Sequence, residues 1–114
     1  MSIEAMWQVT FGAGITATGV EFGAGVVVLE TGRLFGGDSW FYYIGTYNVV
    51  GEDVTCEISV RRHTPGNASV LGKDNSILIL RAKFNQEQML LVGNDAENPA
   101  MQFQASIRRI AELP

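Results

Sequence analysis

The sequence has one cysteine, one histidine and few charged side chains. A single cysteine cannot form an intrachain disulfide or a cysteine-based zinc site, and a single histidine cannot supply a two-histidine metal site. The 8 basic residues, against 12 acidic ones, form no basic stripe, so we expect no nucleic-acid binding. No apolar run approaches the ~20 residues of a membrane-spanning helix. The start, MSIEAMWQV, has no signal-peptide pattern, so we expect a cytoplasmic protein with no membrane association.

Glycine and β-forming residues are abundant instead, with 13 glycines in 114 residues. Turn signals recur about every ten residues, which predicts one all-β domain over residues 1–114. We expect strands at 5–11, 23–30, 39–50, 54–63, 76–84, 88–93 and 101–110, with an eighth from 33–35 or 15–20. The turns at 31–32, 51–53 and 85–87 are short, and such turns join antiparallel neighbours in a meander. Only the last ten residues could carry a helical turn, and the alternative is that they finish the last strand.

An antiparallel meander of about eight strands can form a two-sheet sandwich or a closed barrel. We favour the barrel because closure removes exposed strand edges. Some expected strands are apolar on both faces: the one over 39–50 carries Phe41 and Tyr43 on one face, and Tyr42 and Ile44 on the other. A barrel has only one interior, so the outer apolar side chains need a cover. A second copy of the chain is the simplest cover, and we expect a homodimer.

Two glycine-rich stretches resemble nucleotide-binding motifs. GAGITA, residues 12–17, matches a dinucleotide fingerprint, but the glycine-broken sequence after it cannot form the required helix. Gly36-Gly37-Asp38 lacks the Lys-Ser/Thr ending of a phosphate-binding loop. We interpret these three residues as a structural turn in which Asp38 accepts backbone hydrogen bonds. No cofactor is therefore expected.

The residues needed for catalysis are also sparse. His63 lies at an expected strand end with no nucleophile motif, which is typical of a solvated side chain. Cys56 falls on the apolar face of its strand, where a thiol behaves as a small hydrophobe. We expect no catalytic residue, no metal ligand and no enzymatic activity.

Aromatic side chains are the remaining candidates for a site: Trp40, Phe41, Tyr42, Tyr43 and Tyr47. Such residues can simply fill a barrel interior or form an interface. If the interior is incompletely filled, they would line an apolar pocket in which tyrosine hydroxyls provide the polar contacts. The alternative to an interaction module is therefore a carrier or sensor for a small apolar ligand.

The stretch GVVVLETGRLFGGDSWFYYIGTY, residues 25–47, combines an apolar strand, a glycine turn, the GGD triplet and a tyrosine-rich strand. It resembles the GrlR-like proteins, named after a negative regulator of type III secretion genes in enteropathogenic bacteria, and the likeness runs from about Trp7 to Arg109. The resemblance implies a dimeric, non-enzymatic, lipocalin-like barrel. It also implies binding to a transcriptional regulator through an acidic loop, whose counterpart here is VGED, with Glu52 and Asp53.

Overall fold

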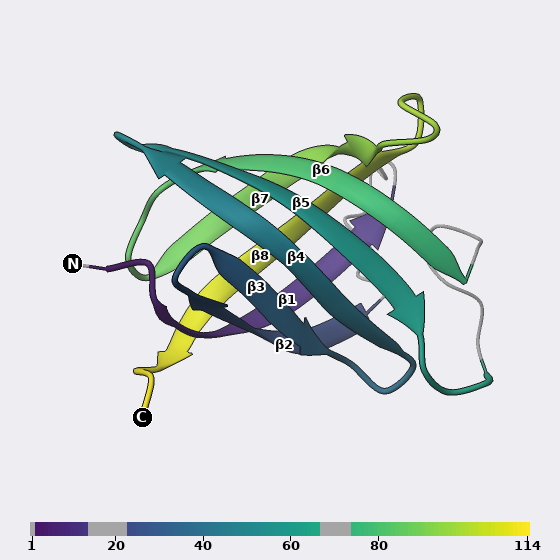
Figure 1. Cartoon of the computed structure of the whole chain (residues 1–114), viewed down its shortest axis with the longest axis horizontal. Coiled ribbons are helices and arrows are strands. Elements are labelled where there is room, and N and C mark those ends of the chain that lie inside the picture. Colours follow the sequence, from purple (N-terminus) through teal and green to yellow (C-terminus); the bar gives the residue numbers. More distant parts are fainter. Residues whose placement is uncertain (1, 14–22, 67–73) are drawn as a thin grey trace.

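A computed structural model describes residues 2–13, 23–66 and 74–114, and these ranges form strands and connecting turns without a helix (Figure 1). The strands are β1 (Ala5–Ala13), β2 (Gly23–Glu30), β3 (Arg33–Gly37), β4 (Phe41–Val50), β5 (Asp53–Arg62), β6 (Asn75–Lys83), β7 (Gln88–Asp95) and β8 (Gln102–Ala111). Within these ranges nothing helical is long and apolar enough to cross a bilayer.

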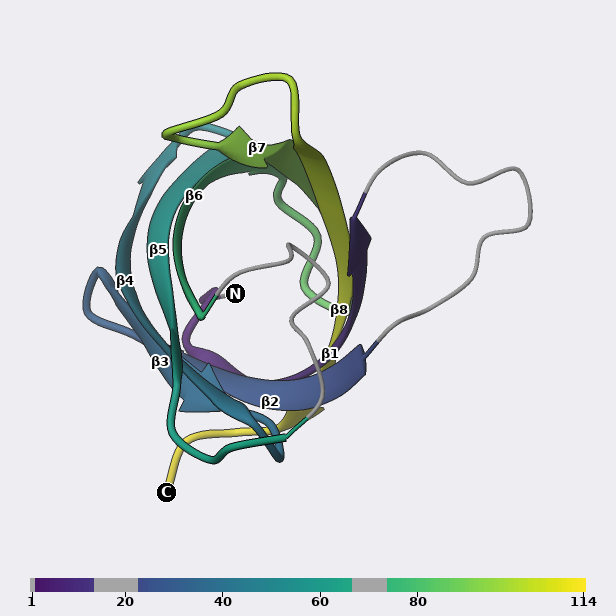
Figure 2. The ribbon, with the colours of Figure 1, turned by 90° about the vertical axis from the view of Figure 1, so that its right-hand side faces the viewer.

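The eight strands form a closed antiparallel barrel in which each strand pairs with the next along the chain. Closure occurs between β8 and β1, where Val9 is opposite Ile107. Figure 2 shows the resulting ring of strands. The predicted all-β meander barrel is therefore confirmed. The eighth strand comes from the expected region at 33–35, whereas the alternative at 15–20 lies outside the described residues.

Two hairpin turns have the backbone geometry that their residues favour. Thr31 and Gly32 have φ values of 51° and 79°, as two-residue turns between twisted strands require. The turn between β4 and β5 consists of Gly51 and Glu52, because Val50 already pairs with Asp53. The expected three-residue turn at 51–53 is thus one residue too long.

Two other expected boundaries are wrong for local reasons. β4 begins at Phe41 rather than at residue 39, because residues 38–40 form a turn. Of the two alternatives for the last ten residues, the strand is the one observed, because β8 continues to Ala111. The turn before β7 is longer than the expected 85–87, since β6 ends at Lys83 and β7 begins at Gln88.

Alternation along the strands separates a dry interior from the outer surface. The core consists of Ile3, Ala5, Trp7, Val9, Val27, Leu29, Leu34, Phe41, Tyr43, Val54, Cys56, Ile58, Leu78, Leu80, Met89, Leu91, Phe103, Ala105 and Ile107. These side chains come from all eight strands and from the segment before β1. Cys56, expected on the apolar face of its strand, points inward with Trp7, Val54 and Phe103.

One end of the barrel is closed by Trp7 and Arg109, and we call it the plugged end. Trp7 is fully buried, and its indole N–H donates to the Ile3 carbonyl at 3.1 Å. The Arg109 guanidinium lies 5.0 Å from the Trp7 ring centroid and donates to the Gln86 carbonyl at 2.6 Å. Arg109 also donates to the Ser2 carbonyl. This guanidinium therefore connects the N-terminal segment to the turn before β7.

Candidate functional site: an interior cavity and an outer apolar face

The opposite end of the barrel is organised by Asp38, and we call it the Asp38 end. One Asp38 carboxylate oxygen, Oδ1, accepts hydrogen bonds from the backbone N–H groups of Trp40 and Phe41, each at 2.8 Å. The Asp38 N–H donates to the Phe41 carbonyl at 2.9 Å. Asp38 thus holds the tight turn through which the chain passes from β3 into β4.

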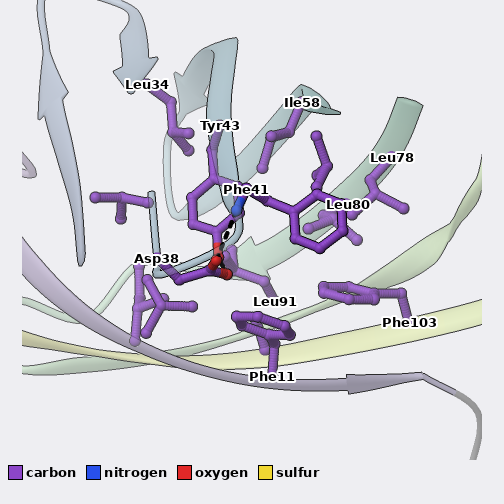
Figure 3. Close-up of a pocket in the computed structure, with 15 residues that line it drawn as sticks. Phe11, Leu34, Asp38, Phe41, Tyr43, Ile58, Leu78, Leu80, Leu91 and Phe103 are labelled. Carbon is purple, nitrogen blue, oxygen red and sulfur yellow. Dashed lines mark hydrogen bonds between the residues drawn. The ribbon is translucent and has the colours of Figure 1, made fainter. Parts of the chain in front are cut away.

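Tyr43 forms a hydrogen bond with the other Asp38 carboxylate oxygen. Its hydroxyl donates to Oδ2, as the dashed line in Figure 3 shows. Burial and the Asp38 carboxylate raise the pKa of Tyr43 above its ordinary value, so the hydroxyl stays protonated. The Phe11 ring meets the Tyr43 ring edge-on at 6.2 Å. At Gly25 a Cβ would lie 3.2 Å from the Tyr43 hydroxyl, so the glycine leaves space for this oxygen.

Next to this pair the interior contains an apolar cavity of about 70 Å³ (Figure 3). Its lining is Val9, Phe11, Val27, Leu34, Asp38, Phe41, Tyr43, Ile58, Val60, Leu78, Leu80, Leu91, Phe103, Ala105 and Ile107. Asp38 and Tyr43 are the polar members of this set, and they are hydrogen-bonded to each other. The two polar side chains satisfy each other, so the cavity can accept an apolar group.

The five aromatic candidates separate into three environments. Phe41 and Tyr43 line the cavity. Tyr42 points outward and is 37% exposed. Trp40 packs against the core, and its ring occupies the place where a Cβ on Gly66 would lie. Tyr47 is on the inner face of β4 and packs against the core without lining the cavity; burial raises its pKa. The structure therefore does not bring the five rings together in one pocket.

The outer surface of β1–β4 carries a continuous apolar row. Met6, Val28, Phe35 and Ile44 are register neighbours on four successive strands. Side chains at such positions lie about 5 Å apart and contact one another. Phe35 is 39% exposed and Ile44 is 56% exposed. With Val26 and Tyr42, which flank Gly37 in the next row, these residues form what we call the β1–β4 face.

The next strand, β5, adds opposite charges to one side of this face. Ser59 is the register neighbour of Ile44, and Glu57 and Arg61 lie two positions before and after it. Both charged side chains are exposed, and neither forms an ion pair within the described ranges. The β1–β4 face thus has apolar side chains along its centre, with the Arg33 guanidinium 5.9 Å from the Phe35 ring, and one acidic and one basic group on its β5 edge.

The turn that carries Glu52 and Asp53 is at the plugged end, far from the Asp38 end. Asp53 forms an ion pair with Lys83, and this contact raises the pKa of Lys83. The Glu52 carbonyl accepts a hydrogen bond from the Phe84 N–H at 2.7 Å. The turn therefore presents the Glu52 side chain, which has no ion-pair partner among residues 2–13, 23–66 and 74–114, and the Asp53 side chain, which shares its charge with a lysine.

His63 and Cys56 lie apart from each other. His63 is exposed just after β5, as expected of a strand-end residue, but its ring also contacts the Asp38 carbonyl through Nε2 at 2.9 Å. Cys56 is buried, and burial raises its pKa to about 11. In residues 2–13, 23–66 and 74–114 no group of three or more His, Cys, Asp or Glu side chains could hold a metal ion.

Asp38 is a cavity residue whose role the sequence did not reveal: it was expected only to hold a turn, yet it also lines the cavity through its contact with Tyr43. Ser76, on the inner face of β6, is 4% exposed and is not part of the cavity lining. Residues 76–80 are apolar on both faces of the strand, so the sequence pattern does not show which face Ser76 is on.

Comparisons with protein-family models and with curated proteins find no match to this chain. The GrlR-like family assignment therefore stays a prediction.

Proposed function

We propose that this protein is a regulatory interaction module that acts as a homodimer and restrains a transcriptional regulator, as the resemblance to GrlR-like proteins suggests. The observation that carries the proposal is the β1–β4 face. A closed barrel has no free strand edge, so a partner binds it through a face or a loop. A contiguous apolar patch on such a surface is typical of an interaction site.

A second copy of the chain fits this face by its charge pattern. In a two-fold dimer whose axis runs along the Phe35–Ile44–Ser59 row, this face of one copy packs against the same face of the other. Residues on one side of the row then lie opposite residues from the other side of the row in the partner. Glu57 of one copy then faces Arg61 of the partner, and the reverse contact forms by symmetry. The two pairs lie at the β5 end of the buried apolar row, which gives an apolar centre with a charged edge, as stable interfaces show.

A charge exchange tests the dimer. Glu57→Arg alone places like charges opposite each other at two symmetric positions and should weaken dimerisation at least tenfold in sedimentation equilibrium. Arg61→Glu alone should do the same. The double variant Glu57→Arg/Arg61→Glu restores opposite charges and should restore the dimer. Two single variants that dimerise as tightly as the original protein would contradict this arrangement.

The regulatory part needs a separate test in the protein's own host. We propose that Glu52 and Asp53 contact the regulator, because Glu52 is exposed, forms no ion pair within the described part of the chain, and lies in a turn at the plugged end. Extra copies of the unchanged gene should lower type III secretion transcripts. Glu52→Ala/Asp53→Ala should lose this effect and keep the dimer. Transcripts that do not respond to the unchanged gene would overturn the regulatory role and leave the dimer proposal intact.

A further inference from the structure

The two halves of the barrel interior differ in packing. At the plugged end, large side chains such as Trp7 and Val54 are almost completely buried. Toward the Asp38 end, about 70 Å³ remains empty, and side chains from all eight strands line this space. Protein interiors are normally packed to crystal-like density, and atoms that border a void lose contacts on that side. A bound molecule of the right size would restore those contacts.

The polar side chains of the cavity are occupied by contacts within the protein. Asp38 Oδ1 accepts two backbone N–H groups, and Oδ2 accepts the Tyr43 hydroxyl. All other lining residues among those described are apolar. A ligand group that needs hydrogen bonds would lose its bonds to water on entering, which costs free energy. Cavities lined by Leu, Ile and Phe instead stay dry and bind apolar molecules such as benzene.

Four aromatic rings distinguish this lining from an aliphatic one. They belong to Phe11 on β1, Phe41 and Tyr43 on β4, and Phe103 on β8, and Figure 3 shows them around the cavity. The Phe11 ring meets Tyr43 edge-on at 6.2 Å and stacks on Phe103 at 6.0 Å. These are the two arrangements in which aromatic rings attract each other beyond the effect of burial. A further ring in the cavity would have partners on three different strands.

The volume limits the ligand to one ring. A buried water occupies roughly 10–15 Å³ of comparable volume, so the cavity has room for about five to seven non-hydrogen atoms. We propose that the cavity binds a single-ring aromatic hydrocarbon, of the class of benzene. The ligand fills the apolar space and contacts the surrounding rings through its edge and faces. This role is independent of the proposed dimer, because the cavity side chains point inward and the β1–β4 face points outward.

The test is a titration of the full-length, methyl-labelled protein with benzene and with cyclohexane, followed by NMR. We expect benzene to shift the Ile58, Leu78 and Leu91 methyl signals saturably. Cyclohexane has the same number of carbons but no aromatic ring, so it should bind at least about threefold more weakly. Phe103→Leu removes one ring from the wall and keeps it apolar, so this variant should show a smaller preference for benzene.

Ala105→Leu adds side-chain volume to the cavity wall and should abolish benzene binding. Gln104→Leu places the same side chain at the next position of β8, on the exposed outer side, and is the matched control that should bind normally. The methyl spectrum also reports whether each variant is folded. Phe103→Leu keeps the proposal testable if the larger side chain at position 105 is not tolerated.

Four results would overturn the proposal. Benzene that causes no saturable shift would assign the cavity to water alone, and shifts confined to outward methyl groups such as those of Ile44 would place benzene on the surface. Cyclohexane binding as tight as that of benzene would remove the aromatic class. Tetramethylammonium binding more tightly than benzene would assign the rings and the Asp38 carboxylate to a cation. A folded Ala105→Leu variant that binds benzene normally would exclude the cavity as the site.

Discussion

Tyr43→Phe removes one hydroxyl from the Asp38 turn and keeps the ring that packs against Phe11. Asp38 retains its two backbone donors and loses the third. A hydrogen bond to a charged group contributes about 1.5–3 kcal/mol, and the lower value applies here because Asp38 is only partly buried and water can replace the donor. A loss of about 1.5 kcal/mol lowers the Tm of a domain of this size by about 6 °C.

Thermal and urea unfolding followed by circular dichroism measure this loss. Tyr42→Phe is the matched control, because Tyr42 is the next residue of β4 and points outward. Removing its hydroxyl should change the free energy of unfolding by less than about 0.5 kcal/mol. Equal effects of the two substitutions would show that the bond between Tyr43 and Asp38 does not stabilise the turn.

Three further predictions follow from single residues. Burial raises the pKa of Cys56 from 9.0 to about 11, so the unfolded chain loses this proton first and stability falls by about 2 kcal/mol as pH rises from 9 to 11. Cys56→Ala should reduce that fall in urea unfolding measured at both pH values. Arg109→Met keeps the alkyl stem but loses the contact with Trp7 and the hydrogen bonds to carbonyl groups. We expect the free energy of unfolding to fall by about 2–3 kcal/mol and amide exchange near residue 3 to become faster. Gly45→Ala places a Cβ 2.1 Å from the Glu57 carbonyl oxygen, so β4 and β5 must separate, and a loss of about 2 kcal/mol or more should appear in thermal unfolding.

The fold was predictable because alternation and turn chemistry point to the same answer. Trp7 and Val9 on one face and Gln8 on the other identify a strand with one dry side, and the Thr31-Gly32 turn identifies an antiparallel hairpin. The resulting order of strands is what the barrel shows. The strand boundaries were less predictable. β4 begins two residues later than expected, because the Asp38 side chain accepts hydrogen bonds from the backbone of Trp40 and Phe41 and so forms a turn there.

The site was less predictable, because its properties depend on distances between strands. The pattern correctly placed Phe41 and Tyr43 opposite Tyr42, but could not show that Tyr47 lies outside the cavity lining. The cavity volume has no local sequence signal, because it arises from how side chains of several strands pack together.

Native mass spectrometry of the unmodified protein and of Phe35→Glu and Leu90→Glu shows whether the β1–β4 face holds two copies of the chain together. Phe35 is in the β1–β4 face, whereas Leu90 is a similarly exposed apolar residue on β7, outside that face. We expect a dimer for the unmodified protein and for Leu90→Glu, and a monomer for Phe35→Glu. An unmodified protein that is monomeric at micromolar concentration would contradict the account, and so would a Phe35→Glu variant that remains dimeric.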